Sequence, residues 1–211
     1  HKLEPVNLLS IDEYKEASER YQFLETQADD AEKAKQNLET LIRQLDRLAR
    51  DEFTATLEKI QTHFGETFEE LFQGGKARLI WPEDADILTC DIDVWAQPPG
   101  KKPAVLQQLS GGEKALTGIA LLFSLLKTKP APFVLFDEID APLDEANVVR
   151  FTNALKKFTD TTQMVIITHN KRTMAAAQSL YGVTMKQRGI SNLVSMKLIE
   201  DGRVVQEARV A

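Results

Sequence analysis

The sequence predicts an α/β protein in which a long coiled-coil helix leads into a mainly parallel sheet covered by helices. Apolar residues recur every seven positions over most of the first 71 residues, as in a helix that packs against another helix. In residues 72–211, short apolar runs alternate with amphipathic stretches, which is typical of a parallel sheet with helices on both faces. The 211 residues, 43% of them hydrophobic, suffice for one sizeable core and an extended arm.

The arm is predicted from two heptad seam positions. The first holds Tyr14, Tyr21, Ala28, Lys35, Ile42 and Ala49, and the second holds Ala17, Leu24, Ala31, Leu38, Leu45 and Glu52. Alanines, one lysine and one glutamate weaken this narrow stripe, so we expect the helix to need a partner strand. A long surface helix of an ordinary domain is the alternative.

A second apolar stripe continues the helix one residue out of register. It consists of Phe53, Leu57, Ile60, Phe64, Phe68 and Leu71. Its aromatic content predicts that the helix docks onto a globular body, and Gly74-Gly75 predicts that it ends in a left-handed cap. We therefore expect an arm over residues 1–71 and a globular lobe over residues 72–211.

The lobe is expected to contain strands and helices in turn. Strands are predicted at residues 77–81, 88–96, 133–137, 164–168, 181–185 and 193–198, and helices at 111–127, 145–158 and 171–178. The strand at 88–96 alternates polar and apolar residues, whereas those at 133–137 and 164–168 are continuously apolar, which indicates burial on both faces.

Composition excludes several classes of protein. A single cysteine, Cys90, allows no internal disulfide or cysteine zinc cluster and fits a reducing compartment. No apolar run approaches the roughly 18 residues of a membrane span, and no signal peptide is visible. Because the chain begins with His1, we expect an excised fragment. A net charge of −6 argues against strong DNA binding by this chain alone.

The first chemical motif is Leu109-Ser110-Gly111-Gly112-Glu113. Serine followed three residues later by glutamate, at the start of an apolar helix, is a capping box. The two glycines leave the N-terminus of this helix, which we call the helix mouth (Ser110–Glu113), free of bulky side chains. Free backbone amides and the helix dipole favour the binding of a phosphate there. A plain N-cap is the alternative.

Two acids, Asp137 and Glu138, follow a buried strand. Ligands of open α/β sheets bind outside the carboxyl ends of strands. One acid can hold Mg²⁺, usually through water, and the other can orient and deprotonate an attacking water. Acidic turn residues without function are the alternative. Asp144 is well placed to cap the helix from Glu145.

His169 follows the next apolar strand, which we expect beside the strand that ends in Asp137. There its imidazole can hydrogen-bond a γ-phosphate or the attacking water. A lone histidine is more often structural than catalytic.

In order and spacing, these features resemble the signature motif, Walker B motif, D-loop and switch histidine of the ATP-binding-cassette (ABC) superfamily. Within it the chain resembles the SMC (structural maintenance of chromosomes) family, bacterial members above all. The resemblance runs from about Phe64 to Leu198 and is carried by LSGGEKALTGIALLFSLLK, FVLFDEIDAPLDEANV, VIITHNKRTM and YGVTM.

The resemblance implies the C-terminal lobe of an ABC-type ATPase head, with ATP and Mg²⁺ as cofactors. It implies that Asp137 is the metal-associated aspartate, Glu138 the catalytic base and His169 the switch histidine. The resemblance also implies nucleotide contacts by Ser110, Gly111, Gly112, Glu113 and the D-loop aspartate Asp144. Of these, Ser110, Gly111 and Gly112 are implied to contact the γ-phosphate of an ATP molecule that a different head holds.

The sequence contains no G-x-x-x-x-G-K-[ST] phosphate-binding loop. The resemblance implies that an N-terminal half of the same head supplies it, so we expect this chain alone to bind ATP weakly or not at all and to show no turnover. It further implies a second SMC head, as a homodimer, a kleisin subunit at Gly182–Leu198, and DNA bound through the full-length assembly. Chromosome condensation and segregation in the cytoplasm, at the nucleoid and away from membranes, is the implied role.

Three alternatives remain open. A membrane-transporter nucleotide-binding domain carries its phosphate loop upstream of the signature, where this chain has a coiled-coil arm. Double-strand-break repair ATPases share the split head, and a non-hydrolysing coiled-coil scaffold is also possible. Basic residues at Lys101, Lys102, Lys171 and Arg172 are interpreted as solvated loop charges rather than a DNA contact.

Overall fold

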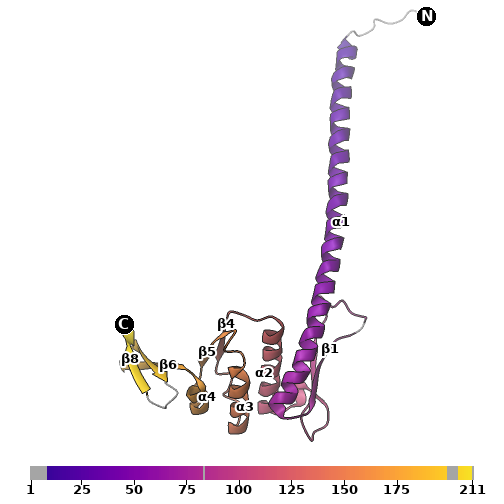
Figure 1. The fold of residues 1–211 in the computed structure, drawn as a ribbon. Helices are drawn as coiled ribbons and strands as arrows, with labels where there is room; N and C mark the ends of the chain where they lie inside the picture. The colour runs from indigo at the N-terminus through magenta and orange to yellow at the C-terminus, as the bar shows by residue number, and fades with distance from the viewer. Residues whose placement is uncertain (1–8, 83, 199–203, 211) are drawn as a thin grey trace, which may run out of the picture. The chain divides into compact units, whose positions relative to one another are not determined.

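The computed structural model describes residues 9–82, 84–198 and 204–210, which form two compact units divided between Thr54 and Ala55 (Figure 1). Helix α1, Leu9–Phe72, provides the described part of the first unit and continues into the second. The expected boundary between residues 71 and 72 stays a prediction. No helix in the described ranges has the length and apolar character needed to cross a membrane.

In the first unit, the predicted seam of α1 is exposed. Tyr14, Tyr21, Leu24, Leu38 and Leu45 each have more than half of their surface accessible. Charged side chains one turn apart pair along the helix, as between Lys33 and Asp29. A stripe of apolar residues on a single helix has nothing to pack against within that helix, so it stays open to solvent.

In the second unit, the last turns of α1 dock as predicted. Phe64 and Phe68 are completely buried. The helix ends at Phe72, and Gln73 rather than a glycine takes the first left-handed position, with φ 58°. The amide of Gly74 then donates to the carbonyl of Glu69 at 2.9 Å, which closes a Schellman-type cap one residue earlier than expected.

The first sheet is antiparallel, with strands in the order β1 (Lys76–Ile80), β2 (Asp93–Gln97) and β3 (Ala104–Val105). A short 3₁₀ helix, Leu106–Gln108, follows β3. The strand expected from residue 88 begins only at residue 93, because a turn at Asp86 draws in the amides of Leu88 and Cys90.

The second sheet has two parallel strands, β4 (Phe133–Asp137) and β5 (Gln163–Ile167), joined through helix α3 (Glu145–Lys156). Helix α2 (Gly111–Thr128) precedes β4, and the short α4 (Lys171–Ala176) follows β5. These elements match the predicted ones to within two residues at most ends.

The third sheet is antiparallel and contains β6 (Ser179–Gln187), β7 (Ile190–Leu198) and β8 (Val204–Val210). The prediction of a mainly parallel sheet is therefore not confirmed: of the five described strand pairs, only β4–β5 is parallel. The reason is connectivity, because parallel neighbours need a crossover, and α3 supplies one only between β4 and β5.

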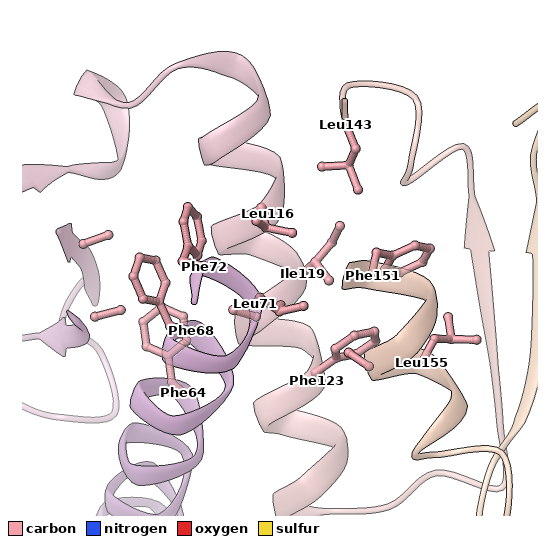
Figure 2. Close-up of a cluster of buried hydrophobic side chains, with 14 of the residues drawn as sticks. Phe64, Phe68, Leu71, Phe72, Leu116, Ile119, Phe123, Leu143, Phe151 and Leu155 are labelled. Atoms are coloured by element: carbon pink, nitrogen blue, oxygen red, sulfur yellow. The ribbon is translucent and has the colours of Figure 1, made fainter. Parts of the chain in front are cut away.

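The core of the second unit lies around α2, with α1 on one side and α3 on the other (Figure 2). Phe123 of α2 is fully buried and stacks on Phe151 of α3 with ring centroids 6.0 Å apart. Phe136 of β4 meets both rings edge-on. This packing fixes α2 and the end of β4, and with them the residues that precede α2 and follow β4.

Candidate functional site

The carboxyl ends of β4 and β5 lie at the same edge of their sheet. Asp137 pairs in register with Ile167, and the amide of Glu138 donates to the carbonyl of Ile167 at 2.9 Å. This confirms that His169 follows a strand beside the one ending in Asp137. Nδ1 of His169 lies 3.8 Å from Oε1 of Glu138, and both side chains are exposed. An acid and an imidazole thus meet where a phosphate or water can approach from solvent.

Glu138 has an unusual backbone, with φ 47°. A non-glycine residue in the left-handed region costs on the order of 1 kcal/mol, and such residues cluster at functional sites. The conformation turns the chain sharply after β4. Glu138 therefore lies outside the strand, so the alternation of side chains along a strand does not decide how it is oriented relative to Asp137.

The described residues contain no cluster of three metal-ligating side chains. Mg²⁺ in nucleotide sites is held by one or two carboxylates together with phosphates and water, so such a cluster is not required. Asp137 is exposed at the tip of β4, beside the Glu138 turn. A single accessible carboxylate at a strand end fits an ion of this kind.

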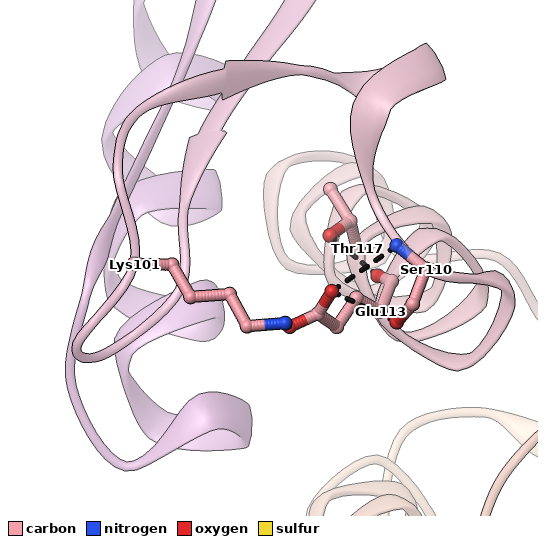
Figure 3. A network of polar contacts seen from close by, with 4 residues as sticks. All are labelled: Lys101, Ser110, Glu113 and Thr117. Carbon is pink, nitrogen blue, oxygen red and sulfur yellow. Dashed lines mark hydrogen bonds and ion pairs between the residues drawn. The ribbon is translucent and has the colours of Figure 1, made fainter.

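The start of α2 forms the expected capping box (Figure 3). Oε2 of Glu113 accepts from the backbone amide of Ser110 at 3.1 Å and from Oγ of Ser110 at 2.8 Å. Thr117, one turn on, donates to the carbonyl of Glu113. The helix mouth is thereby fixed with Ser110 exposed at its tip.

Lys101 takes part in this network, so this exposed loop charge also has a partner. Its Nζ lies 2.8 Å from Oε1 of Glu113. The hydrogen bond from Lys101 holds the pKa of the Glu113 carboxyl below its usual range; burial opposes this effect, and the bonds from Ser110 reinforce it. The loop before β3 is thus tied to the helix mouth. Arg172 is also paired, with Glu145 at 2.9 Å.

The loop between β4 and α3 lies against the same helix mouth. A Cβ added to Gly112 would lie 3.2 Å from the carbonyl oxygen of Pro142, so the loop approaches closely at this glycine. Gly111 has open space around its Cα. Asp144 caps α3 as predicted, by accepting from the amide of Asn147 at 2.8 Å.

The predicted site residues thus form two groups. Ser110, Gly112 and Glu113 belong to the mouth of α2, while Glu138 and His169 lie at the strand ends. Within the described ranges, no hydrogen bond or ion pair joins the side chains of the two groups.

Sequence reasoning missed a third cluster, made of Asp140, Thr168 and Thr173. Oδ2 of Asp140 accepts from the hydroxyl of Thr168 at 2.7 Å and from that of Thr173. Asp140 is only 1% exposed. An acid flanked by Ile139 and Ala141 was a signal of burial, but nothing local indicated its partners.

Three known proteins illustrate the relationships of the chain. It is 48% identical over 205 residues to the chromosome partition protein Smc of Bacillus subtilis, which covers 97% of this chain but only 17% of that protein. A solved Smc head domain with an extended coiled coil, bound to the C-terminal domain of ScpA and derived from Pyrococcus furiosus, is 36% identical with a TM-score of 0.71. The match covers 90% of this chain and 47% of that one.

A further structure, from work described as the structural biochemistry of ATP-driven dimerization and DNA stimulated activation of SMC ATPases, is 42% identical with a TM-score of 0.64. The match covers 71% of this chain and 90% of that one. The predicted resemblance to SMC heads is confirmed at this level. The family described as RecF/RecN/SMC N terminal domain matches residues 7–192. Because this match spans most of the sequence, the chain belongs to the RecF/RecN/SMC N terminal domain family.

Proposed function

We propose that this chain is the C-terminal half of the ATPase head of a chromosome-condensing and segregating SMC protein. Together with an N-terminal half that carries the Walker A loop, it hydrolyses ATP. The observation that carries the proposal is the meeting of Glu138 and His169, 3.8 Å apart, beyond the carboxyl ends of two parallel strands.

In this proposal each residue has a separate task. Glu138 orients the attacking water and accepts its proton as the oxygen attacks the γ-phosphorus, while the bond from the γ-phosphorus to the bridging oxygen breaks and ADP leaves. His169 donates a hydrogen bond to a γ-phosphate oxygen, and Asp137 holds Mg²⁺ through water. Mg²⁺, when bound, neutralises charge that develops on the phosphate oxygens.

The need for a second half is supported by the outer face of the β4–β5 sheet. Phe133, Leu135, Val165 and Ile167 lie on this face and are 45–66% exposed. Contiguous exposed apolar residues mark interaction surfaces. The matched region makes up 47% of the Pyrococcus furiosus head chain, so more than half of that chain has no counterpart here. We propose that the N-terminal half of the head covers this face.

The mouth of α2 is proposed to complete the nucleotide site of a second head, in a homodimer. Ser110 and the backbone of Gly111 and Gly112 donate to a γ-phosphate held by that head, and Asp144 reaches the same interface. ATP would then join the heads and hydrolysis would separate them, which moves the arms and the DNA held by the full-length assembly at the nucleoid. The ATP-driven dimerization named for the 42% identical relative supports this step.

A kleisin subunit is proposed to bind the third sheet around Gly182–Leu198. Tyr181, Val183 and Met185 alternate along β6 and are all exposed, so they form an apolar stripe. Binding of a head to the C-terminal domain of ScpA in the related structure supports this assignment. Val183→Asp should abolish binding of the kleisin C-terminal domain in calorimetry, and wild-type affinity would contradict the assignment.

Steady-state ATPase measurements, on this chain alone and after mixing with the Walker A half at saturating ATP and Mg²⁺, test the main proposal. We expect turnover only after mixing, and loss of turnover with Ser110→Arg or Glu138→Gln. Glu138→Gln should retain ATP-dependent association of heads, whereas Ser110→Arg should lose it. Robust turnover by the chain alone would contradict the split site. Association of the halves without turnover would favour the scaffold alternative.

A further inference from the structure

We propose that Asp140 is a positioning residue, which holds Glu138 and His169 at their spacing by joining the two loops that carry them. The inference rests on the proposed function, because it assigns catalytic tasks to those two residues. It concerns a buried carboxylate that has no task in the proposed hydrolysis.

Asp140 lies two residues after Glu138, within consecutive turns. The amide of Ala141 donates to the carbonyl of Glu138 at 3.1 Å, and the amide of Leu143 donates to the carbonyl of Asp140 at 3.1 Å. The side chain is 1% exposed, and no ion pair with a cation is recorded for it among the described residues. A buried carboxylate is costly unless it accepts hydrogen bonds, so its donors decide where this loop settles.

Both side-chain donors come from the segment around His169. Thr168 immediately precedes the histidine, and its hydroxyl donates to Oδ2 of Asp140 at 2.7 Å. The same hydroxyl accepts from the amide of Asn170, the residue after His169, at 2.9 Å. Thr173 of α4 donates to the same carboxylate oxygen. His169 is thus held on both sides by residues tied to Asp140.

The consequence is geometric. Glu138 and His169 are exposed, so the positions of their side chains depend on the backbone of the loops that carry them. A misplacement of about 1 Å in a catalytic constellation can cost about 100-fold in rate. Loosening the Asp140 cluster should therefore lower turnover without removing any group that contacts ATP.

The test uses the head reconstituted with its Walker A half. Thr168→Val removes the hydroxyl and keeps the shape, whereas Thr168→Ser keeps the hydroxyl; Thr173→Val and Thr173→Ser form a second pair. We expect each valine variant to lower kcat about 10-fold or more, with the KM for ATP and ATP-dependent head association changed less than about threefold, and each serine variant to restore kcat. The matched control is Thr152→Val, a buried threonine of α3 whose hydroxyl donates to the carbonyl of Val149 in its own helix.

Wild-type kcat in both valine variants, or no rescue by serine, would overturn the inference. Hydrogen exchange provides a readout that needs no turnover: amides of residues 138–144 and 168–173 should exchange faster in Thr168→Val than in Thr152→Val. If the wild-type head fails to hydrolyse ATP, the proposed function fails, while the exchange result still decides whether Asp140 joins the loops. Unchanged exchange in Thr168→Val would show that Asp140 does not hold the two loops together.

Discussion

The two faces of the β4–β5 sheet are similar in composition and opposite in environment. On the inner face, Phe136 is 6% exposed and packs against Phe123 and Phe151. On the outer face, Phe133 and Leu135 are exposed by 66% and 59%. Residues one position apart on the same strand thus lie in the core and in solvent.

This difference indicates that one face holds the lobe together and the other is kept for a partner. The inner face is closed by α2 and α3, which belong to this chain. The outer face offers apolar side chains on two strands whose outer edges have no partner among the described strands. Apolar composition alone therefore does not distinguish a core from an interface.

The largest effect is expected on the inner face. Phe136→Ala should reduce the free energy of unfolding by about 3–5 kcal/mol, because it removes a buried ring and leaves a cavity. Urea denaturation followed by circular dichroism measures this loss. Leu135→Ala is the matched control on the outer face and should change stability by about 0.5 kcal/mol or less. Equal losses in the two variants would contradict the contrast between the faces.

The next effect is expected on the outer face. Leu135 and Val165 are paired across the two strands. The double change Leu135→Thr and Val165→Thr removes apolar surface and keeps residues suited to strands. We expect the affinity for the Walker A half to fall about 10- to 100-fold, since the two changes together remove about three buried carbons at roughly 0.8 kcal/mol each. Calorimetric titration measures it, and unchanged affinity would mean that another surface receives that half.

A smaller effect is expected at the mouth of α2, which is tied down by Lys101. Lys101→Met should lower stability at pH 7 by about 1 kcal/mol or less, because the lysine is more than half exposed. The pKa of Glu113 is depressed in the folded chain, so its contribution is present above the unfolded pKa of about 4.3 and is lost as the pH falls through the lower folded pKa.

Thermal unfolding between pH 3 and pH 8 tests this sign. Wild type and Lys101→Met should differ at pH 7 and converge as the pH falls through the lowered pKa of Glu113 in the folded chain. Lys102→Met, at a neighbouring lysine for which the described structure records no ion pair, should have no such pH dependence. A difference that persists in acid would mean that Lys101 stabilises the loop by packing rather than by charge.

The smallest effect is expected beside β5. Thr162 is 3% exposed, and its hydroxyl has no hydrogen-bond partner among the described residues. Thr162→Val keeps the shape and removes the unpaired group, so stability should be unchanged or higher by up to about 1 kcal/mol. Thr173→Val, which leaves the Asp140 carboxylate short of a donor, should be destabilising in the same urea assay. A loss with Thr162→Val would indicate that its hydroxyl is satisfied by water.

Much of the site could be predicted because its parts are local. The capping box of Ser110 and Glu113 and the cap of Asp144 each join residues three positions apart. Continuous apolar runs before Asp137 and His169 predicted two neighbouring buried strands, and only their burial on both faces was wrong. The left-handed turn at Glu138 and the pairing of Lys101 with Glu113 were not predictable, because neither residue type carries a signal for them.

By itself the sequence determined the long helix, the order of strands and helices around α2 and α3, and the positions of the candidate catalytic residues at strand and helix ends. These follow from periodicity and capping, which act over a few residues. Only the tertiary structure decided which face of β4–β5 is covered and that, among the described strands, antiparallel pairs outnumber parallel ones. It alone also joined Asp140 to Thr168 and Thr173, which lie 28 and 33 residues away. Such contacts depend on how separate elements pack, and a local pattern contains no information about the partner.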